Sequence, residues 1–120
     1  MGSIASDVTS AADALARAGV SCTVATVASL NPTPLDDLVG LLANFRAALT
    51  IEAHYVVGGI GSLISEIVAE HGLRCRVKRC GVKRVPDGRS GSQGFLYSQH
   101  GLSTGQLVET ALQMLNSVLN

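Results

Sequence analysis

The sequence contains no tryptophan and only two tyrosines and two phenylalanines, so aromatic residues make up 3% of its 120 positions. A hydrophobic core must therefore be built from aliphatic side chains, which is typical of helices packed on a buried sheet. The scarcity of aromatic side chains also argues against a surface that stacks nucleic-acid bases. Hydrophobic residues nevertheless make up 47% of the chain and charged residues 15%. This balance excludes intrinsic disorder and predicts one folded domain over residues 1–120.

The chain also lacks an excess charge and a long apolar run. Nine basic residues balance nine acidic ones, so the overall charge does not predict binding to nucleic acid or to an anionic membrane. The apolar stretches fall far short of the roughly 20 residues that cross a bilayer. Residues 1–7 have neither the basic nor the apolar part of a secretory signal. We therefore expect a cytoplasmic protein.

Metal-ligand spacing is absent from the sequence as well. Cys22, Cys75 and Cys80 form no CxxC pair, and the three histidines lie far apart along the chain. Neither set matches the spacing of a zinc site. We expect no metal site, and in a reducing compartment we expect all three cysteines to act as small hydrophobic residues.

Helical and strand patterns alternate along the whole chain. Helices are expected over 4–18, from Pro34 with an apolar stripe that reaches Phe45, over 63–71 and over 103–118; strands are expected over 20–28, 47–53 and 73–81. Residues 82–94 have loop composition, and 95–100 could form a short helical turn. The alternation predicts an α/β fold with parallel strands and right-handed crossover helices.

A glycine-rich turn separates the second expected strand from the third helix. It reads Gly58, Gly59, Ile60, Gly61 and Ser62. Amides at a helix N-terminus can hold an anion, but the segment is neither a Walker loop nor a GxGxxG fingerprint. A tight turn with close helix packing is the favoured interpretation, and anion binding is the alternative.

Glu52 and His54 lie at the carboxyl end of the second expected strand, on the same side of an extended segment. This is the edge of the sheet where α/β proteins place their ligands, so both residues are site candidates. No serine or cysteine nucleophile accompanies them at motif spacing. A structural role for Glu52, in which it accepts hydrogen bonds from loop amides, is favoured over acid–base chemistry.

Seven of the nine basic residues gather between positions 74 and 89: Arg74, Arg76, Lys78, Arg79, Lys83, Arg84 and Arg89. On a strand, the first three would share one face, with Cys75, Val77 and Arg79 on the other. The favoured interpretation is an edge strand whose charges discourage aggregation. A surface for a phosphate or an acidic partner is the first alternative, and RNA binding is the weakest one.

Several of these segments together resemble, in order and spacing, the C-terminal domain of transketolase-type, thiamine diphosphate-dependent enzymes. The matching segments are Gly19-Val20 at the start of a strand, Leu30 to Asp36 (LNPTPLD), Ile51 to His54 (IEAH), Gly58 to Ser62 (GGIGS), Val85 to Ser92 (VPDGRSGS) and His100 to Ser103 (HGLS). Each motif alone is weak, and the ordered set covers nearly the whole chain. The resemblance is closest to split transketolases, in which a separate C-terminal subunit carries this domain.

The resemblance implies a three-layer α/β/α fold with a mostly parallel sheet. It implies that thiamine diphosphate and a divalent metal ion (Mg²⁺) serve the complete enzyme, held between its pyrimidine-binding and diphosphate-binding domains or subunits. No catalytic, cofactor-binding or metal-binding residue carries over to this domain, whose implied task is dimer and domain contact. Glu52, Gly58, Gly59, Gly61 and Ser62 carry over as a conformational signature near an interdomain surface, and His54 as a residue that faces the neighbouring domain. Ala53 departs from the family's second acidic residue.

The first expected element is a helix, whereas the family fold has a strand before it in the middle of a five-stranded mixed sheet. Gly2 and Ser3 match the end of that strand, so we expect a sheet that lacks its N-terminal strand, in a fragment of a larger enzyme or in a sheet completed by rearrangement or by a dimer. Two functions follow. The first is a dimerisation and interdomain-contact domain of an enzyme that transfers two-carbon ketol units between sugar phosphates. The second is a free-standing binding module for a phosphate ligand or an acidic protein partner.

Overall fold

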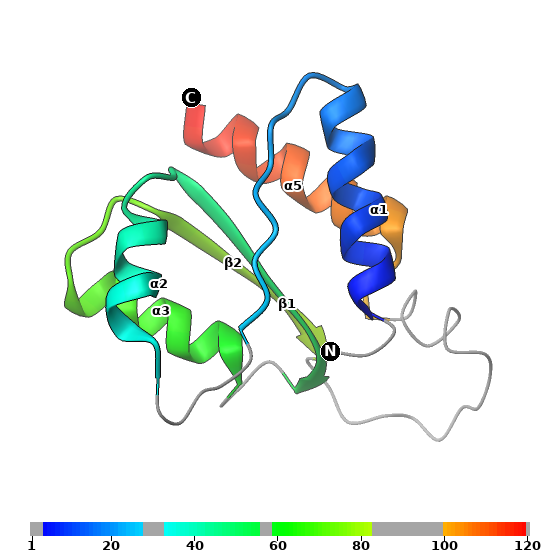
Figure 1. Ribbon diagram of the computed structural model, residues 1–120. Coiled ribbons are helices and arrows are strands. Elements are labelled where there is room, and N and C mark those ends of the chain that lie inside the picture. The colour runs from blue at the N-terminus through cyan, green and yellow to red at the C-terminus, as the bar shows by residue number, and fades with distance from the viewer. Residues whose placement is uncertain (1–3, 28–32, 56–58, 83–99, 120) are drawn as a thin grey trace.

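The computed structural model describes residues 4–27, 33–55, 59–82 and 100–119, with the side chains of 53–55, 82 and 119 left out. In chain order the elements are α1 (Ile4–Arg17), α2 (Leu35–Leu42), β1 (Ala47–Tyr55), α3 (Ile60–Glu70), β2 (Arg76–Val82) and α5 (Thr104–Leu119). Helices and strands alternate through the middle of the chain (Figure 1). The α/β class predicted from the sequence is confirmed.

The two described strands form a parallel sheet that lies between two layers of helices. β1 pairs with β2 in a register that sets Ala47 opposite Arg76 and Ile51 opposite Cys80. Helices α2 and α3 cover one face of this sheet, and α1 and α5 cover the other (Figure 1). The three-layer α/β/α architecture and the parallel pairing therefore match the expectation.

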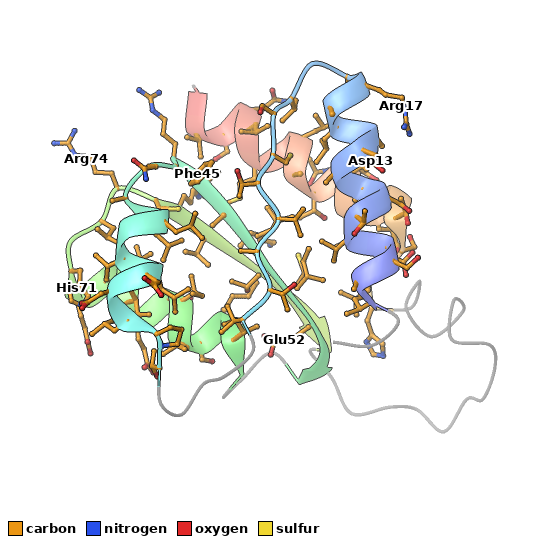
Figure 2. The ribbon with its side chains drawn as sticks, in the orientation of Figure 1. Asp13, Arg17, Phe45, Glu52, His71 and Arg74 are labelled. Atoms are coloured by element: carbon orange, nitrogen blue, oxygen red, sulfur yellow. The ribbon has the colours of Figure 1, made fainter. Side chains whose placement is uncertain are left out.

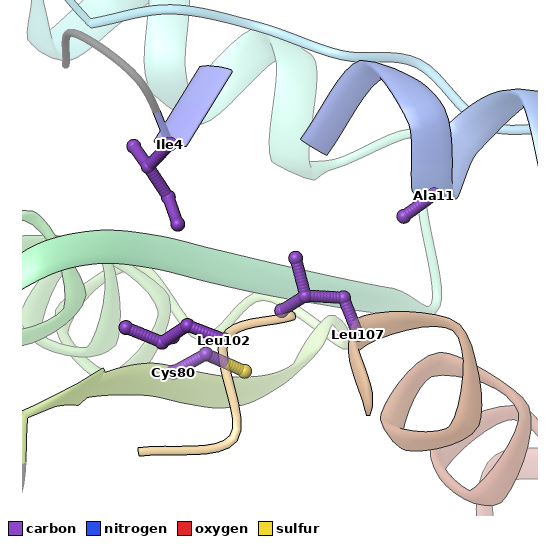
Figure 3. Close-up of a cluster of buried hydrophobic side chains, with 5 residues drawn as sticks. All are labelled: Ile4, Ala11, Cys80, Leu102 and Leu107. Carbon is purple, nitrogen blue, oxygen red and sulfur yellow. The ribbon is translucent and has the colours of Figure 1, made fainter. Parts of the chain in front are cut away.

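Each face of the sheet has its own hydrophobic cluster. On the side of α1 and α5, Leu49 and Ile51 of β1 pack against five buried residues: Ile4, Ala11, Cys80, Leu102 and Leu107 (Figure 3). On the other side, Ala48 of β1 packs against Leu38, Leu42, Ile64, Ile67 and Cys75. Because side chains alternate between the two faces along β1, they contribute to two separate hydrophobic clusters.

The expected strand over 20–28 is wrong for its described part. Residues 20–27 follow an extended course and line an apolar groove together with β1, but they are not assigned as a strand and none of the described strands pairs with them (Figure 1). A strand needs a hydrogen-bonded neighbour as well as β-favouring residues. Val24 in this segment is 50% exposed, whereas a strand buried on both faces would cover it.

The second helix ends earlier than its apolar spacing predicts. α2 stops at Leu42, and the Asn44 side-chain amide donates to the Gly40 carbonyl at 2.9 Å, so it satisfies a carbonyl at the helix end. Phe45, expected on the buried stripe, is 37% exposed, and Leu35 at the other end is 40% exposed. The third strand starts at Arg76 and not at residue 73.

The structure confirms the glycine stops predicted after the first and third helices and the capping box predicted at the start of the last helix. Gly19 and Gly72 follow α1 and α3 with φ angles of +87° and +61°, the left-handed conformation that suits glycine. Ser103 and Gln106 form the predicted capping box at α5, with the Gln106 Oε1 atom 3.2 Å from the Ser103 amide nitrogen and the Gln106 amide 3.4 Å from the Ser103 hydroxyl.

Two sequence predictions lie outside the described residues, namely the loop over 82–94, apart from its first residue, and the helical turn over 95–100, apart from its last. Within the described ranges, no helix combines the length and the apolar character that crossing a membrane requires.

Candidate functional site

Glu52 occupies the centre of the site that the sequence singles out. It lies on β1, its side chain is 3% exposed, and Figure 2 shows it near the end of β1 that faces the start of α3. Its Oε1 accepts a hydrogen bond from the Ile60 amide at 3.2 Å, and its Oε2 accepts one from the Gly61 amide at 3.1 Å. Glu52 therefore has the structural role that the sequence favoured for it.

These hydrogen bonds anchor the beginning of α3. The first amides of a helix have no partner within the helix, and the helix dipole makes its N-terminus favourable for a negative charge. The preceding residue, Gly59, offers no side-chain cap. The Glu52 carboxylate thus replaces a local cap with a group from a neighbouring strand, and it fixes α3 against the sheet.

The glycines beside Glu52 are required by close packing. A Cβ atom on Gly59 would overlap the Glu52 carboxylate, with Cδ only 2.9 Å away. A Cβ atom on Gly61 would lie 2.8 Å from the Thr50 hydroxyl and 3.0 Å from Arg79 Cγ. Both φ and ψ of Gly59 are compatible with an extended residue, so the lack of space and not the backbone conformation demands glycine here.

The packing decides between the two interpretations of the glycine-rich turn. The amides of Ile60 and Gly61, which an external anion would need, already donate to Glu52. A phosphate would have to displace a buried carboxylate that carries the same sign of charge. The geometry therefore favours the tight turn with close helix packing.

The remaining residues of the predicted signature are only partly described. Ser62 lies in the first turn of α3 and is half-buried. The backbone of His54 belongs to β1, but its side chain is outside the described part of the structure, and Gly58 is outside it altogether. That His54 faces a neighbouring domain stays a prediction.

The basic segment divides between two faces, as the sequence predicts for β2. Arg76 and Lys78 line one hollow together with Thr110, Gln113 and Ser117 of α5, and Arg76 Nη1 donates to Ser117 Oγ at 2.6 Å. Arg79 lies on the opposite face, against Gly61. Arg74 precedes the strand, so its expected place on the strand face is wrong. All four side chains are exposed, whereas Lys83, Arg84 and Arg89 lie outside the described residues.

Three properties of the described residues were not predicted from the sequence. Thr50 is 7% exposed, and its hydroxyl has no hydrogen-bond partner among the described residues. Cys22 is exposed, which does not suit its expected role as a small hydrophobic residue, whereas Cys75 and Cys80 are buried, as that role predicts. Burial raises the pKa of the Cys75 thiol. Of these three properties, only the burial of Thr50 could have been anticipated from the sequence, because strand periodicity puts it on the same face as Glu52.

The described part of the chain contains no group of side chains that could bind a metal ion. No three histidine, cysteine, aspartate or glutamate side chains come together there in a way that could hold an ion.

Comparison with known proteins places this geometry in a family. The family model described as "Transketolase, C-terminal domain" matches residues 1–114. One subunit of the apulose-4-phosphate transketolase of Actinobacillus succinogenes is 31% identical over 95% of this chain and 37% of its own length. A 1-deoxy-D-xylulose-5-phosphate synthase of Dechloromonas aromatica is 34% identical over 81% of this chain and 16% of its own length.

A solved structure agrees with the sequence relatives. The chain matches a split gene transketolase, described as an inactive β4 tetramer, with a TM-score of 0.80 and 28% identity over 94% of this chain and 35% of the other. The chain thus spans well under half the length of these relatives. Because the family model covers almost all of the sequence and the fold agrees, the chain belongs to the transketolase C-terminal domain family.

Proposed function

We propose that this chain is the C-terminal assembly domain of a thiamine diphosphate-dependent, transketolase-like enzyme, with dimerisation and contact to the other domains as its direct task. The complete enzyme would transfer two-carbon ketol units between sugar phosphates in the cytoplasm. The match to the transketolase C-terminal model over residues 1–114 carries this proposal. The similarity to a transketolase subunit and to a split gene transketolase supports partner subunits of the same enzyme.

The chemistry of the described residues supports a contact role over a catalytic one. Glu52, the buried carboxylate of the site, is engaged by the amides of α3. A general acid or base must reach a proton of the substrate, and a carboxylate that is 3% exposed and doubly hydrogen-bonded is poorly placed for this. Its evident contribution is to hold β1 and α3 in one fixed arrangement.

Thiamine diphosphate and Mg²⁺ do not fit the described residues of this chain. Mg²⁺ prefers oxygen ligands in octahedral geometry, and no cluster of carboxylates gathers in the described ranges. The amides at the start of α3, which could hold a diphosphate, donate to Glu52. The proposal therefore assigns the cofactor and its metal ion to the pyrimidine-binding and diphosphate-binding partners.

The proposal also names the reaction that the complete enzyme catalyses. The relatives include both a transketolase subunit and 1-deoxy-D-xylulose-5-phosphate synthases, so chains similar to this domain occur in more than one kind of enzyme. We favour transketolase, because the transketolase subunit matches 95% of this chain and the split gene transketolase structure 94%, whereas the synthases of Dechloromonas aromatica and Heliobacterium modesticaldum match 81% and 89%.

Reconstitution tests the proposed function. This chain is mixed with the pyrimidine-binding and diphosphate-binding polypeptides of the same organism, with thiamine diphosphate and Mg²⁺, and ketol transfer between sugar phosphates is measured. We expect co-assembly and activity in the mixture, and no saturable cofactor binding when this chain is titrated alone in a calorimeter. Tight cofactor binding by the isolated chain, or full activity and assembly without it, would contradict the proposal.

A further inference from the structure

A hollow of about 410 Å³ lies between β2 and the C-terminal half of α5. Two cations, Arg76 and Lys78, line it from β2, and the polar side chains of Thr110, Gln113 and Ser117 line it from α5. None of the described residues that line the hollow is acidic. The hollow therefore combines positive charge with polar groups that form hydrogen bonds, and it suits an anionic group.

Helices cover only the far end of the face of β2 that carries these cations. Cys80 lies on the same face by the alternation of a strand, and it is buried in a cluster with Leu102 and Leu107. Arg76 and Lys78, nearer the start of the strand, are exposed. The described helices thus leave the first half of this face open to a partner.

The Arg76 guanidinium is held in position without being neutralised. Its Nη1 donates to Ser117 Oγ at 2.6 Å, and a guanidinium has further N–H donors beyond this one. The Glu109 carboxylate of α5 accepts a hydrogen bond from the Gln113 amide at 3.3 Å and does not line the hollow. Among the described residues, no carboxylate forms an ion pair with Arg76 or Lys78. Both cations are available to a carboxylate from outside.

The backbone of β2 offers an edge beside the hollow. β2 pairs with β1, and no other described strand pairs with it. The Arg76 amide donates to the Arg46 carbonyl at 2.8 Å, so residue 76 turns its backbone toward β1. Successive residues of a strand point their N–H and C=O groups to opposite edges, so those of Val77 and Arg79 point away from β1. An edge of this kind is a template for a further strand.

The charges on β2 decide which strand this edge accepts. If two copies of the chain paired through β2, the Arg76 and Lys78 side chains of both copies would lie close together and repel each other. The same cations attract carboxylates. On an extended segment, two acidic side chains separated by one residue lie on one face about 6.6 Å apart, which is the spacing of the two cations along β2.

We propose that β2 and the hollow beside it form a docking site for an extended, acidic segment of a partner polypeptide, with two carboxylates separated by one residue. The backbone of this segment pairs with Val77 and Arg79. Its carboxylates bind Arg76 and Lys78. In such strand addition, backbone hydrogen bonds give affinity and alternate side chains give specificity. The proposal adds a partner surface to the assembly role and does not depend on ketol transfer.

An NMR titration of the 120-residue chain with a synthetic peptide tests the proposal. The probe is the acetylated and amidated peptide Thr-Val-Glu-Thr-Glu-Val-Thr, and the control peptide has glutamine in place of both glutamates. Succinate and inorganic phosphate are titrated separately as small anions. The readouts are the dissociation constant and the shifts and hydrogen exchange of the Val77 and Arg79 amides. The Lys78 amide, which faces β1, is the internal reference.

Two double variants with the same loss of charge separate the hollow from general electrostatic attraction. Arg76→Gln with Lys78→Gln removes both cations of the hollow, whereas Arg17→Gln with Arg74→Gln removes two exposed cations outside its lining. We expect the acidic peptide to shift the Val77 and Arg79 amides and to slow their exchange. Binding should be about tenfold weaker in the first variant and less than about twofold weaker in the second.

Four results would overturn the proposal. The first is a glutamine peptide that binds as tightly as the acidic one, and the second is equal binding of the acidic peptide by both double variants. The third is succinate or phosphate that binds as tightly as the peptide, which would assign the hollow to small anions. The fourth is exchange of Val77 and Arg79 as slow as that of Lys78 without peptide, because the edge would then already be paired. The two peptides are compared on the parent chain, so that result does not depend on how well a variant folds.

Discussion

Gly59 and Glu52 are in such close contact that a single added methyl group on Gly59 would overlap the Glu52 carboxylate. The contact exists because the carboxylate reaches past Gly59 to accept hydrogen bonds from the next two amides of α3. The glycine-rich turn and the glutamate are therefore one structural unit, although they are separate segments of the chain. The consequences of this unit for stability can be measured.

Replacing Gly59 by alanine should destabilise the domain by about 2 kcal/mol, because the new methyl group forces the carboxylate or the helix to move. Gly40→Ala is the matched control. Gly40 lies inside α2 with nothing within 4 Å of an added Cβ, so alanine should stabilise the helix by up to about 1 kcal/mol. Urea unfolding gives both values. Equal effects of the two substitutions would refute the close-contact argument.

Glu52→Gln should lower the free energy of unfolding by about 2 kcal/mol. The glutamine oxygen can accept one of the two amides of α3, whereas its NH₂ group would face the other donor and leave it unsatisfied. Glu66→Gln, on the exposed surface of α3, should change stability by less than about 0.5 kcal/mol. A Glu52→Gln protein as stable as the parent would show that the carboxylate does not anchor α3.

Thr50→Val should stabilise the isolated domain by about 1 kcal/mol. The threonine hydroxyl is buried without a hydrogen-bond partner among the described residues, and valine replaces it by a methyl group of similar size. Thr50→Ser keeps the hydroxyl and removes the methyl group, so it should destabilise the domain. Thermal unfolding of the three proteins provides the comparison, and a less stable valine variant would mean that the hydroxyl has a partner.

The three cysteines should react in two classes. Cys22 is exposed and should react rapidly with a thiol reagent at neutral pH, while Cys75 and Cys80 are buried and should react only after unfolding. Burial raises the pKa of the Cys75 thiol above its ordinary value. Above the pKa of an unfolded thiol, about 8.5, the unfolded chain loses this proton before the folded one, so stability should fall as the pH rises further.

A Cys75→Ala variant separates this effect from other titrations. The alanine protein should lose less stability than the parent between neutral pH and pH values above the thiol pKa. An identical fall in both proteins would show that the Cys75 thiol does not contribute.

Much of the fold could be predicted because local signals agreed with the tertiary structure. The left-handed stops at Gly19 and Gly72 and the Ser103 capping box depend on neighbouring residues, which a sequence displays directly. The same holds for the two faces of β2, because period-2 alternation separates Arg76 from Arg79. The structural role of Glu52 also followed from its place before a glycine-rich turn.

The wrong predictions concern features that depend on distant partners. Residues 20–27 have the β-branched composition of a strand, but pairing needs a neighbour that composition cannot reveal. Phe45 continues the helical spacing of α2, yet the helix stops at Leu42, and the Asn44 side chain binds the Gly40 carbonyl at its end. Strand periodicity puts Thr50 on the face of Glu52, but the burial of its hydroxyl also depends on the approach of α3, which no local pattern encodes.

The most direct test of the assembly role is sedimentation equilibrium of the 120-residue chain over a wide range of concentrations, with and without inorganic phosphate. The account predicts a reversible dimer whose population rises with concentration and does not respond to phosphate. A monomer at every concentration that binds phosphate tightly would contradict the account, and it would favour a free-standing binding module instead.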